Sequence, residues 1–286
     1  MQLPSNFIKD ASKLLPRIRF SRATLPVLTH VLASLDATGI TLVVTDLDRW
    51  LETRTLIPAG PDTPESFLIP SDAMKAIGRA DKNTEVRITC RGPRKHRELR
   101  MLMVCGGIAV ESCHPTIDVS EFPEHPVVDG TETIISARTL ESLAIVAGCA
   151  SKDVTRYVLN GVHFNPEDAG RVIATDGRVL ACAPAVVPNT AFILPSGTVD
   201  VLTHPGFSGI DVQVRIWNVD EGEWISIRGG NHHLVSKLIE GNFPNYRQAI
   251  PAYTPELVTF SPDHRTTAIK WLRSLPDKQS AVHLSW

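Results

Sequence analysis

Apolar and polar residues alternate along much of this chain with a period of two, which is typical of β-strands that face a core on one side. Eight segments show this alternation or a β-branched composition: ITLVVTDL, RWLETRTLI, TEVRITC, LRMLMVCGGIAVES, RVIATDG, VLACAPAVV, DVQVRIWNV and EWISIRG. Turn signals such as DATG, RGPRKHRE and EGE separate these segments. The pattern therefore predicts a protein rich in β-strands.

Five other segments follow a helical pattern, in which a serine precedes a run with apolar residues three and four positions apart. The serines are Ser5, Ser71, Ser136, Ser196 and Ser261. A serine hydroxyl can accept a hydrogen bond from an unpaired N–H group of the first helical turn, so each is predicted to be a helix N-cap. Short helices between groups of strands indicate an α+β fold.

The spacing of the five serines, 66, 65, 60 and 65 residues, indicates an internal repeat of one helix and several strands. The sequence also shows a second repeat, with a longer period of about 120 to 130 residues. Thr-Asp at 45–46 recurs 130 residues later at 175–176, and Phe-Pro at 122–123 recurs 121 residues later at 243–244. Two units thus form a domain, and the domain is duplicated. A third copy is predicted to begin after Pro251 with a strand, a helix and a strand, and to remain incomplete.

Composition limits the class of protein. Hydrophobic residues make up 43% and charged residues 21%, as in soluble globular proteins. No apolar run reaches the roughly 18 residues that span a bilayer, and the N-terminus lacks a signal-peptide pattern, so we expect a cytoplasmic protein. The five cysteines form no C-x-x-C pair, which favours reduced thiols over disulfides or a zinc site.

Charge is distributed unevenly, although the formal net charge is only −2. The predicted helical segments are 5–22, 71–82, 137–152, 196–205 and 263–278. Together they hold 14 basic and seven acidic residues, whereas the remainder holds 15 basic and 24 acidic residues. If the helices share one face, that face is positive and can meet a phosphate backbone. The fourth segment has no basic residue and weakens the pattern.

Four stretches carry a resemblance to a known family: TLPVLTHVLASLDATGITLVVTDLD, RYVLNGVHF, IATDGRVLA and LIEGNFPNYRQAIP. Their sequences and order resemble those of the bacterial DNA sliding clamp, the β subunit of the replicative polymerase, over about residues 1 to 255. The resemblance implies a DNA-clamp fold of repeated β-α-β units, with sheets outside and helices lining a hole for duplex DNA. It implies a clamp domain at 1–127, a second at 128–253 and a partial third, strand-helix-strand, at 254–286.

The same resemblance implies a processivity factor that does no chemistry and needs no cofactor or metal. Such a clamp holds double-stranded DNA through backbone electrostatics with little base readout. The implied protein partners are the replicative polymerase, repair proteins and clamp-loader-type proteins, which dock through short peptide motifs. A homo-oligomer is also implied. Three chains of two domains each would supply six domains, whereas two such chains would not. No membrane partner is expected.

Two sites follow from the sequence. Arg22 and Lys152 stand where the resemblance implies DNA contacts. Charge and helix position alone add Lys9, Lys13, Arg79, Lys82 and Arg138 to the DNA-binding candidates. The family's peptide-binding crevice maps onto Leu159, Thr175, Gly177, Arg178, Leu180, Pro244, Gln248 and Ala249.

The crevice departs from the family pattern in three respects. Arg178-Val179 stands in place of a His-Arg pair, and Arg247-Gln248-Ala249 stands in place of an Arg-Arg-Val sequence. The wall that the end of a third domain supplies is expected to be missing.

Two other functions fit parts of the sequence. Asp46, Asp48 and Asp176 could form a metal-binding acidic set of a phosphodiesterase. However, Asp46 and Asp176 occupy equivalent places in the repeats, which favours structural turns. A truncated clamp paralogue could instead bind a partner protein through open sheet edges or through the altered crevice, without encircling DNA, and Trp286 is a candidate for such a contact. The segment 91–100 is predicted to be a solvated hairpin tip and His232-His233 a surface pair.

Overall fold

The computed structural model describes residues 2–18, 25–57, 64–81, 83–92, 97–167, 169–219 and 222–250, together with Ser261, Asp263, Thr266, Thr267 and Lys270. The chain divides into two compact units, Met1–Phe243 and Pro244–Trp286. In the second unit the structure describes one 3-10 turn, η7 (Tyr246–Ala249). The strand-helix-strand predicted for 254–286 lies outside the described residues, apart from the five single positions.

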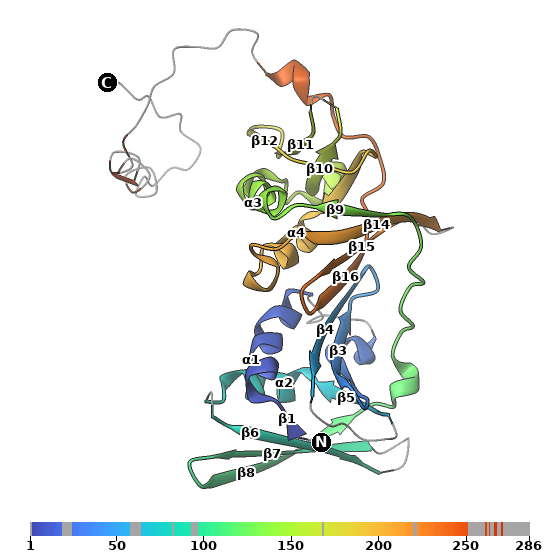
Figure 1. The fold of residues 1–286 in the computed structure, drawn as a ribbon, viewed down its shortest axis with the longest axis vertical. Coiled ribbons are helices and arrows are strands. Elements are labelled where there is room, and N and C mark those ends of the chain that lie inside the picture. Colours follow the sequence, from blue (N-terminus) through green and yellow to red (C-terminus); the bar gives the residue numbers. More distant parts are fainter. Residues whose placement is uncertain are drawn as a thin grey trace. The chain divides into compact units, whose positions relative to one another are not determined.

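The first unit contains one series of eight strands and two helices twice over (Figure 1). The first series is β1 (Gln2–Leu3), α1 (Ser5–Leu14), β2 (His30–Leu35), β3 (Gly39–Thr45), β4 (Arg49–Leu56), β5 (Glu65–Pro70), α2 (Ser71–Arg79), β6 (Glu85–Arg91), β7 (Arg97–Cys105) and β8 (Ile108–Thr116). The second series is β9 (Glu132–Ile135), α3 (Ala137–Val146), β10 (Gly161–Asn165), β11 (Arg171–Thr175), β12 (Leu180–Pro184), β13 (Phe192–Pro195), α4 (Ser196–Leu202), β14 (Val212–Val219), β15 (Gly222–Gly229) and β16 (His232–Lys237). The predicted α+β class and the duplication are confirmed.

The described strands form three antiparallel sheets. Two have four strands, in the orders β1-β6-β7-β8 and β12-β11-β10-β13. The third has eight, in the order β5-β2-β3-β4-β16-β15-β14-β9. The eight-stranded sheet joins the two series, because β4 of the first pairs with β16 of the second and places Leu51 opposite Leu234. We call this pairing the β4–β16 joint.

Helices α1 to α4 lie along one side of the sheets (Figure 1), and one hydrophobic core fills the space between helices and strands. Each helix contributes fully buried apolar side chains, among them Leu14, Ile77, Leu143 and Val201. Burying one such side chain stabilises the fold by roughly 1.5–3 kcal/mol. The polar faces of the helices are left on the surface. No helix in the described part of the chain is long and apolar enough to cross a membrane.

The helix starts differ in detail from the prediction. Ser136 is the N-cap of α3, and its hydroxyl accepts a hydrogen bond from the N–H group of Thr139. At the other three helices the N-cap is a proline, and the predicted serine is the first helical residue: Pro4-Ser5, Pro70-Ser71 and Pro195-Ser196. The N-cap prediction is therefore wrong for these three serines. Each proline has the extended backbone that an N-cap requires, so the helix begins at the serine, one residue earlier than predicted.

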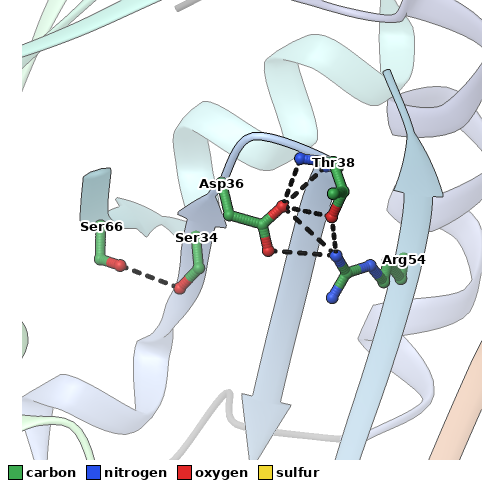
Figure 2. Close-up of polar contacts among 6 residues, drawn as sticks. Ser34, Asp36, Thr38, Arg54 and Ser66 are labelled. Carbon is green, nitrogen blue, oxygen red and sulfur yellow. Dashed lines mark hydrogen bonds and ion pairs between the residues drawn. The ribbon is translucent and has the colours of Figure 1, made fainter. Parts of the chain in front are cut away.

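Figure 2 shows the hairpin turn between β2 and β3, which the sequence marks with DATG. Asp36 Oδ1 accepts hydrogen bonds from the N–H group (2.8 Å) and the hydroxyl (2.7 Å) of Thr38. The hydroxyl bond is the largest of the causes that lower the pKa of Asp36 to about 2. Arg54 of β4 donates to Asp36 Oδ2 over 3.1 Å, and the hydroxyls of Ser34 and Ser66 meet across β2 and β5. The turn thus ties β4 to the β2–β3 hairpin.

Candidate functional site

Free cationic side chains lie on three of the helices. Lys13 of α1, Arg79 of α2 and Arg138 of α3 are exposed, and none forms a hydrogen bond or ion pair with another described residue. Lys152, which follows the 3-10 turn η4 (Ala147–Cys149), is likewise exposed and unpaired within the described part of the chain. Four of the DNA-binding candidates are therefore available to an anionic partner.

Other helix cations are engaged within the protein. Two ion pairs, each 3.0 Å long, neutralise helix residues: Arg17–Asp200 and Lys75–Asp72. The Lys9 amino group donates to the Ala80 carbonyl over 3.1 Å, which ties α1 to the end of α2. The free positive charge on the described helices is thus smaller than the sequence count indicates. Arg22 and Lys82 lie outside the described residues.

The predicted crevice residues of the first unit come from three neighbouring segments. Leu159 ends the 3-10 helix η5 (Val154–Leu159) and is buried. Thr175 ends β11, Leu180 begins β12, and Gly177 and Arg178 lie in the turn between them. Pro244, Gln248 and Ala249 belong to the second unit, where all three are exposed.

Thr175 and Asp176 build the turn between β11 and β12. The Thr175 hydroxyl accepts from the N–H group of Gly177 (3.0 Å) and donates to the carbonyl of Val179 (2.7 Å). The Asp176 carboxylate accepts from the N–H groups of Val179 and Arg178, and these bonds, Val179's first, lower the pKa of Asp176. Gly177 has φ of 87°, a left-handed conformation that favours glycine. Hydrogen bonds therefore fix the backbone of the β11–β12 turn, where three of the predicted crevice residues lie.

Thr45 and Asp46 build the corresponding turn in the first series. The Thr45 hydroxyl accepts from the N–H group of Leu47 (2.9 Å), and Asp46 accepts from the N–H group of Arg49 (2.8 Å) and from its guanidinium. Leu47 occupies the position in this turn that Gly177 occupies in the β11–β12 turn, and its φ is 77°. Both aspartates therefore hold turns, as the repeat predicts. Within the described residues, no group of three or more His, Cys, Asp and Glu side chains could hold a metal ion.

Exposed apolar side chains surround the β11–β12 turn and η5, and the sequence pattern does not predict them. Arg156 of η5 donates from Nη1 to the carbonyl of Asp176 over 3.3 Å, so the two segments lie together. Val154, Tyr157 and Val179 on these segments are 83%, 59% and 54% exposed. Tyr157 also lines a cavity of about 460 Å³ with residues of α4 and the end of β16. Apolar side chains gathered on a surface commonly mark a binding site.

The prediction that His232 and His233 form a surface pair is wrong. His233 is only 6% exposed, and its Nε2 lies 2.8 Å from the Ser226 hydroxyl. Burial first, then the charges of Arg228 and His125, lower the pKa of His233 to about 3. His232 is half-buried, and burial lowers its pKa as well. Both rings are therefore neutral parts of the β4–β16 joint at neutral pH.

Comparison with known proteins links this architecture to one family. The model of the DNA polymerase III beta subunit, central domain, matches residues 135–245. The beta sliding clamp of Synechococcus elongatus is 28% identical over 98% of this chain and 75% of its own length. The beta sliding clamp of Caulobacter vibrioides is 25% identical over 91% of this chain and 70% of its own length. The structure of the DNA polymerase III subunit beta from Pseudomonas aeruginosa matches with a TM-score of 0.71 at 20% identity, over 88% of this chain and 68% of that one.

Proposed function

We propose that this chain, which belongs to the bacterial DNA polymerase III β-subunit (sliding clamp) family, is a processivity factor that binds duplex DNA without sequence specificity. In this role it tethers polymerase or repair proteins to DNA and does no chemistry itself. One observation carries the proposal: the helices of both series share one side of the sheets, and that side bears free cations. Contacts of this kind neutralise phosphates and carry no sequence information, as sliding requires.

The DNA contacts that we propose come from the helix side. The structure supports this role for cations that are exposed and free of partners among the described residues: Lys13, Arg79, Arg138 and Lys152. Lys9 is a weaker candidate because its amino group is bound to Ala80. Arg22 and Lys82 keep the role that the sequence predicts for them.

We further propose that copies of the chain assemble so that their helix sides face a common hole. The proposed domains are 1–127, 128–253 and a partial third at 254–286. A closed ring holds DNA by topology, so weak electrostatic contacts suffice for processivity. The proposed localisation is the cytoplasm, where replicative DNA and polymerases of bacteria are found.

The proposed protein partners are the replicative polymerase and clamp-loader-type proteins, which bind through short peptide motifs. The hydrogen-bonded turn at Thr175-Asp176 and the exposed apolar residues beside it support a docking site there. Its members in the first unit are Leu159, Thr175, Gly177, Arg178 and Leu180. Apolar anchors in a preformed groove supply most of the affinity in such complexes.

Replacing Val154 with Asp and Tyr157 with Ala together is expected to weaken peptide binding at least about tenfold, because apolar contact area is lost. The probe is a peptide selected against the chain from a displayed library of short sequences, and its Kd is measured by fluorescence anisotropy. Leu56→Asp is the matched control, since Leu56 is 77% exposed but lies on β4. Equal loss of affinity in the variant and the control would place the peptide elsewhere.

Topological retention on DNA tests the proposed function. A linear duplex is fixed to a bead at one end and incubated with the protein, and its free end is then blocked with a bulky protein. A wash at about 0.5 M salt removes molecules held only by charge, because screening weakens phosphate contacts steeply. We expect retention on the blocked duplex and release when a restriction enzyme cuts it. Equal release from blocked and open duplexes would contradict the proposal and would indicate that the chain is a protein-binding module that does not encircle DNA.

A further inference from the structure

A cavity of about 460 Å³ lies beside the β4–β16 joint, on the side of the sheet that faces the helices. Its size falls in the range of about 300–1,000 Å³ that is usual for pockets that bind small molecules. Its walls come from α1, β4, the 3-10 turn η6 (Pro205–Phe207) and the β15–β16 turn. Two of these segments belong to each series, so the cavity lies where the two series meet.

One part of the lining is apolar and aromatic. Phe7, Ala11 and Leu14 line the cavity from α1, and their spacing of four and three positions places them on one face of the helix. The His232 ring lines it from β16 and packs against the Phe207 ring, whose centroid lies 5.2 Å away. Aromatic rings beside aliphatic side chains favour a flat, aromatic ligand, because such a ligand can stack on them.

Polar groups without partners line the same cavity. The Asp10 carboxylate and the Asn231 side-chain amide form no hydrogen bond or ion pair with another described residue. The Nδ1 atom of His232 is buried and likewise has no hydrogen-bond partner in the described part of the chain. A buried polar atom of this kind calls for a partner that the protein itself does not supply. The ligand is therefore expected to bring hydrogen-bonding groups of its own.

His204 supplies a hydrogen-bond donor to this cavity. Burial first, then the charge of Arg17, lowers the pKa of His204, so the ring is neutral at neutral pH. Its Nδ1 atom accepts a hydrogen bond from the N–H group of Gly206 over 3.1 Å. The single proton of the neutral ring is therefore on Nε2, which is left to donate. The cavity thus combines a carboxylate acceptor at Asp10 with an imidazole donor at His204.

We propose that this cavity binds a guanine nucleotide, with the base stacked on Phe7 and its Watson–Crick edge at Asp10. Guanine has two adjacent N–H donors, at N1 and N2, and they match the two oxygens of one carboxylate. Its O6 and N7 atoms are acceptors that suit the His204 Nε2–H group. The inference goes beyond the proposed function, since it requires neither DNA nor a second copy of the chain.

The other bases match Asp10 less well. Adenine and cytosine each present one amino group beside an unprotonated ring nitrogen, and the lone pair of that nitrogen repels a carboxylate oxygen. Uracil and thymine have one N–H group between two carbonyls, and both carbonyl oxygens repel the carboxylate. A carboxylate in this position therefore selects guanine, as a site with a fixed acceptor rejects ligands that leave it unpaired.

A cation for the phosphate lies beside the cavity. Lys13 follows Asp10 by three positions on α1, so the two residues lie on the same face of the helix. Lys13 is exposed and free of hydrogen bonds and ion pairs within the described residues, and its charge contributes to the lowered pKa of His204. A phosphate at the edge of the cavity therefore gains a free cation. We expect GMP to bind more tightly than guanosine for this reason.

Calorimetric titration of the full chain with GMP and with AMP tests the site. We expect GMP to bind at least about tenfold more tightly than AMP, because hydrogen bonds to a charged group are strong. Asp10→Asn keeps the shape of the side chain but replaces one acceptor oxygen with a donor, so it is expected to remove this preference. Asp72→Asn is the matched control, since Asp72 is an exposed aspartate of α2 far from the lining, and it should bind GMP as the wild type does.

Either of two calorimetric results would overturn the proposal. One is equal affinity for GMP and AMP, or no binding of GMP up to about 1 mM. The other is an Asp10→Asn variant that keeps the preference of the wild type. Retention on DNA without GMP binding would reject this site and leave the proposed function intact.

Nuclear magnetic resonance of the histidine rings locates the nucleotide independently of any variant at Asp10. Saturating GMP is expected to shift the ring signals of His204 and His232, which line the cavity. His125 and His233 are the internal controls: their rings lie 5.4 Å apart, and His233 points to the opposite face of β16 from His232. Their signals should stay in place. Shifts confined to His125 and His233, or no shift of His204 and His232, would overturn the assignment.

Discussion

Reversing the charges of Lys13, Arg79 and Arg138 together, to Glu, is expected to weaken binding to linear duplex DNA by roughly 10²- to 10³-fold at about 0.1 M salt. Each phosphate contact contributes about −0.9 to the slope of log K against log salt. Three lost contacts therefore remove close to three powers of ten between about 1 M and 0.1 M salt. The slope itself is expected to become shallower by about 2.7, which separates lost phosphate contacts from misfolding.

The matched control reverses three exposed arginines on strand faces that point away from the helices: Arg91, Arg100 and Arg228. It changes the net charge by the same amount, so any difference reports position and not total charge. Affinity and salt slope are measured by fluorescence anisotropy on duplexes of unrelated sequence. If the control loses as much affinity as the helix variant, the helix side is not the DNA-facing surface.

Acidification from pH 7 to pH 4 is expected to lower the free energy of unfolding, and His233 alone accounts for about 3 kcal/mol of the loss by pH 4. Its pKa is about 3 in the folded protein, mainly because the ring is buried. In the unfolded chain it lies near the ordinary value of 6.5. Between these values the unfolded chain binds more protons than the folded one. Stability is therefore complete above pH 6.5 and falls as the pH falls toward 3.

The measurement is urea unfolding of the wild type and of His233→Gln at pH 7, 6, 5 and 4. Glutamine can still bond the Ser226 hydroxyl but does not titrate in this range, so its free energy of unfolding is expected to fall about 3 kcal/mol less. Ser226→Ala is the control. It should keep the steep pH dependence of the wild type, because burial and not the hydroxyl lowers the pKa. Parallel pH profiles for wild type and His233→Gln would contradict the assignment.

Periodicity alone predicts the strands that have one buried and one exposed face. The segments that were predicted as strands from alternation correspond to β3, β4, β6, β7, β8, β11, β12, β14 and β15. Seven described strands were not among them: β1, β2, β5, β9, β10, β13 and β16. Of these, β10, β13 and β16 are buried along nearly their whole length, so no alternation appears in the sequence. For the same reason the sequence pattern predicts a surface position for His233, although this residue lies in β16.

Some features of the candidate site could be predicted from the sequence, and others could not. The turn roles of Asp46 and Asp176 were predicted because the repeat places the same Thr-Asp pair after two strands, and the hydrogen bonds agree. Which helix cations are free depends instead on contacts between distant segments, such as Arg17 with Asp200 and Lys9 with Ala80. The β4–β16 joint likewise pairs strands from different series, and no local sequence pattern predicts this pairing. Such contacts depend on the tertiary fold and cannot be read from neighbouring residues.

The central claim is that copies of this duplicated chain close around DNA, and the absolute mass in solution tests it most directly. Light scattering is recorded at several protein concentrations. We predict a stable species near three times the 31.3 kDa chain mass, independent of concentration above its assembly threshold, because three chains with two series each supply six copies of the series. A wild type that remains at 31.3 kDa at every concentration would contradict the account.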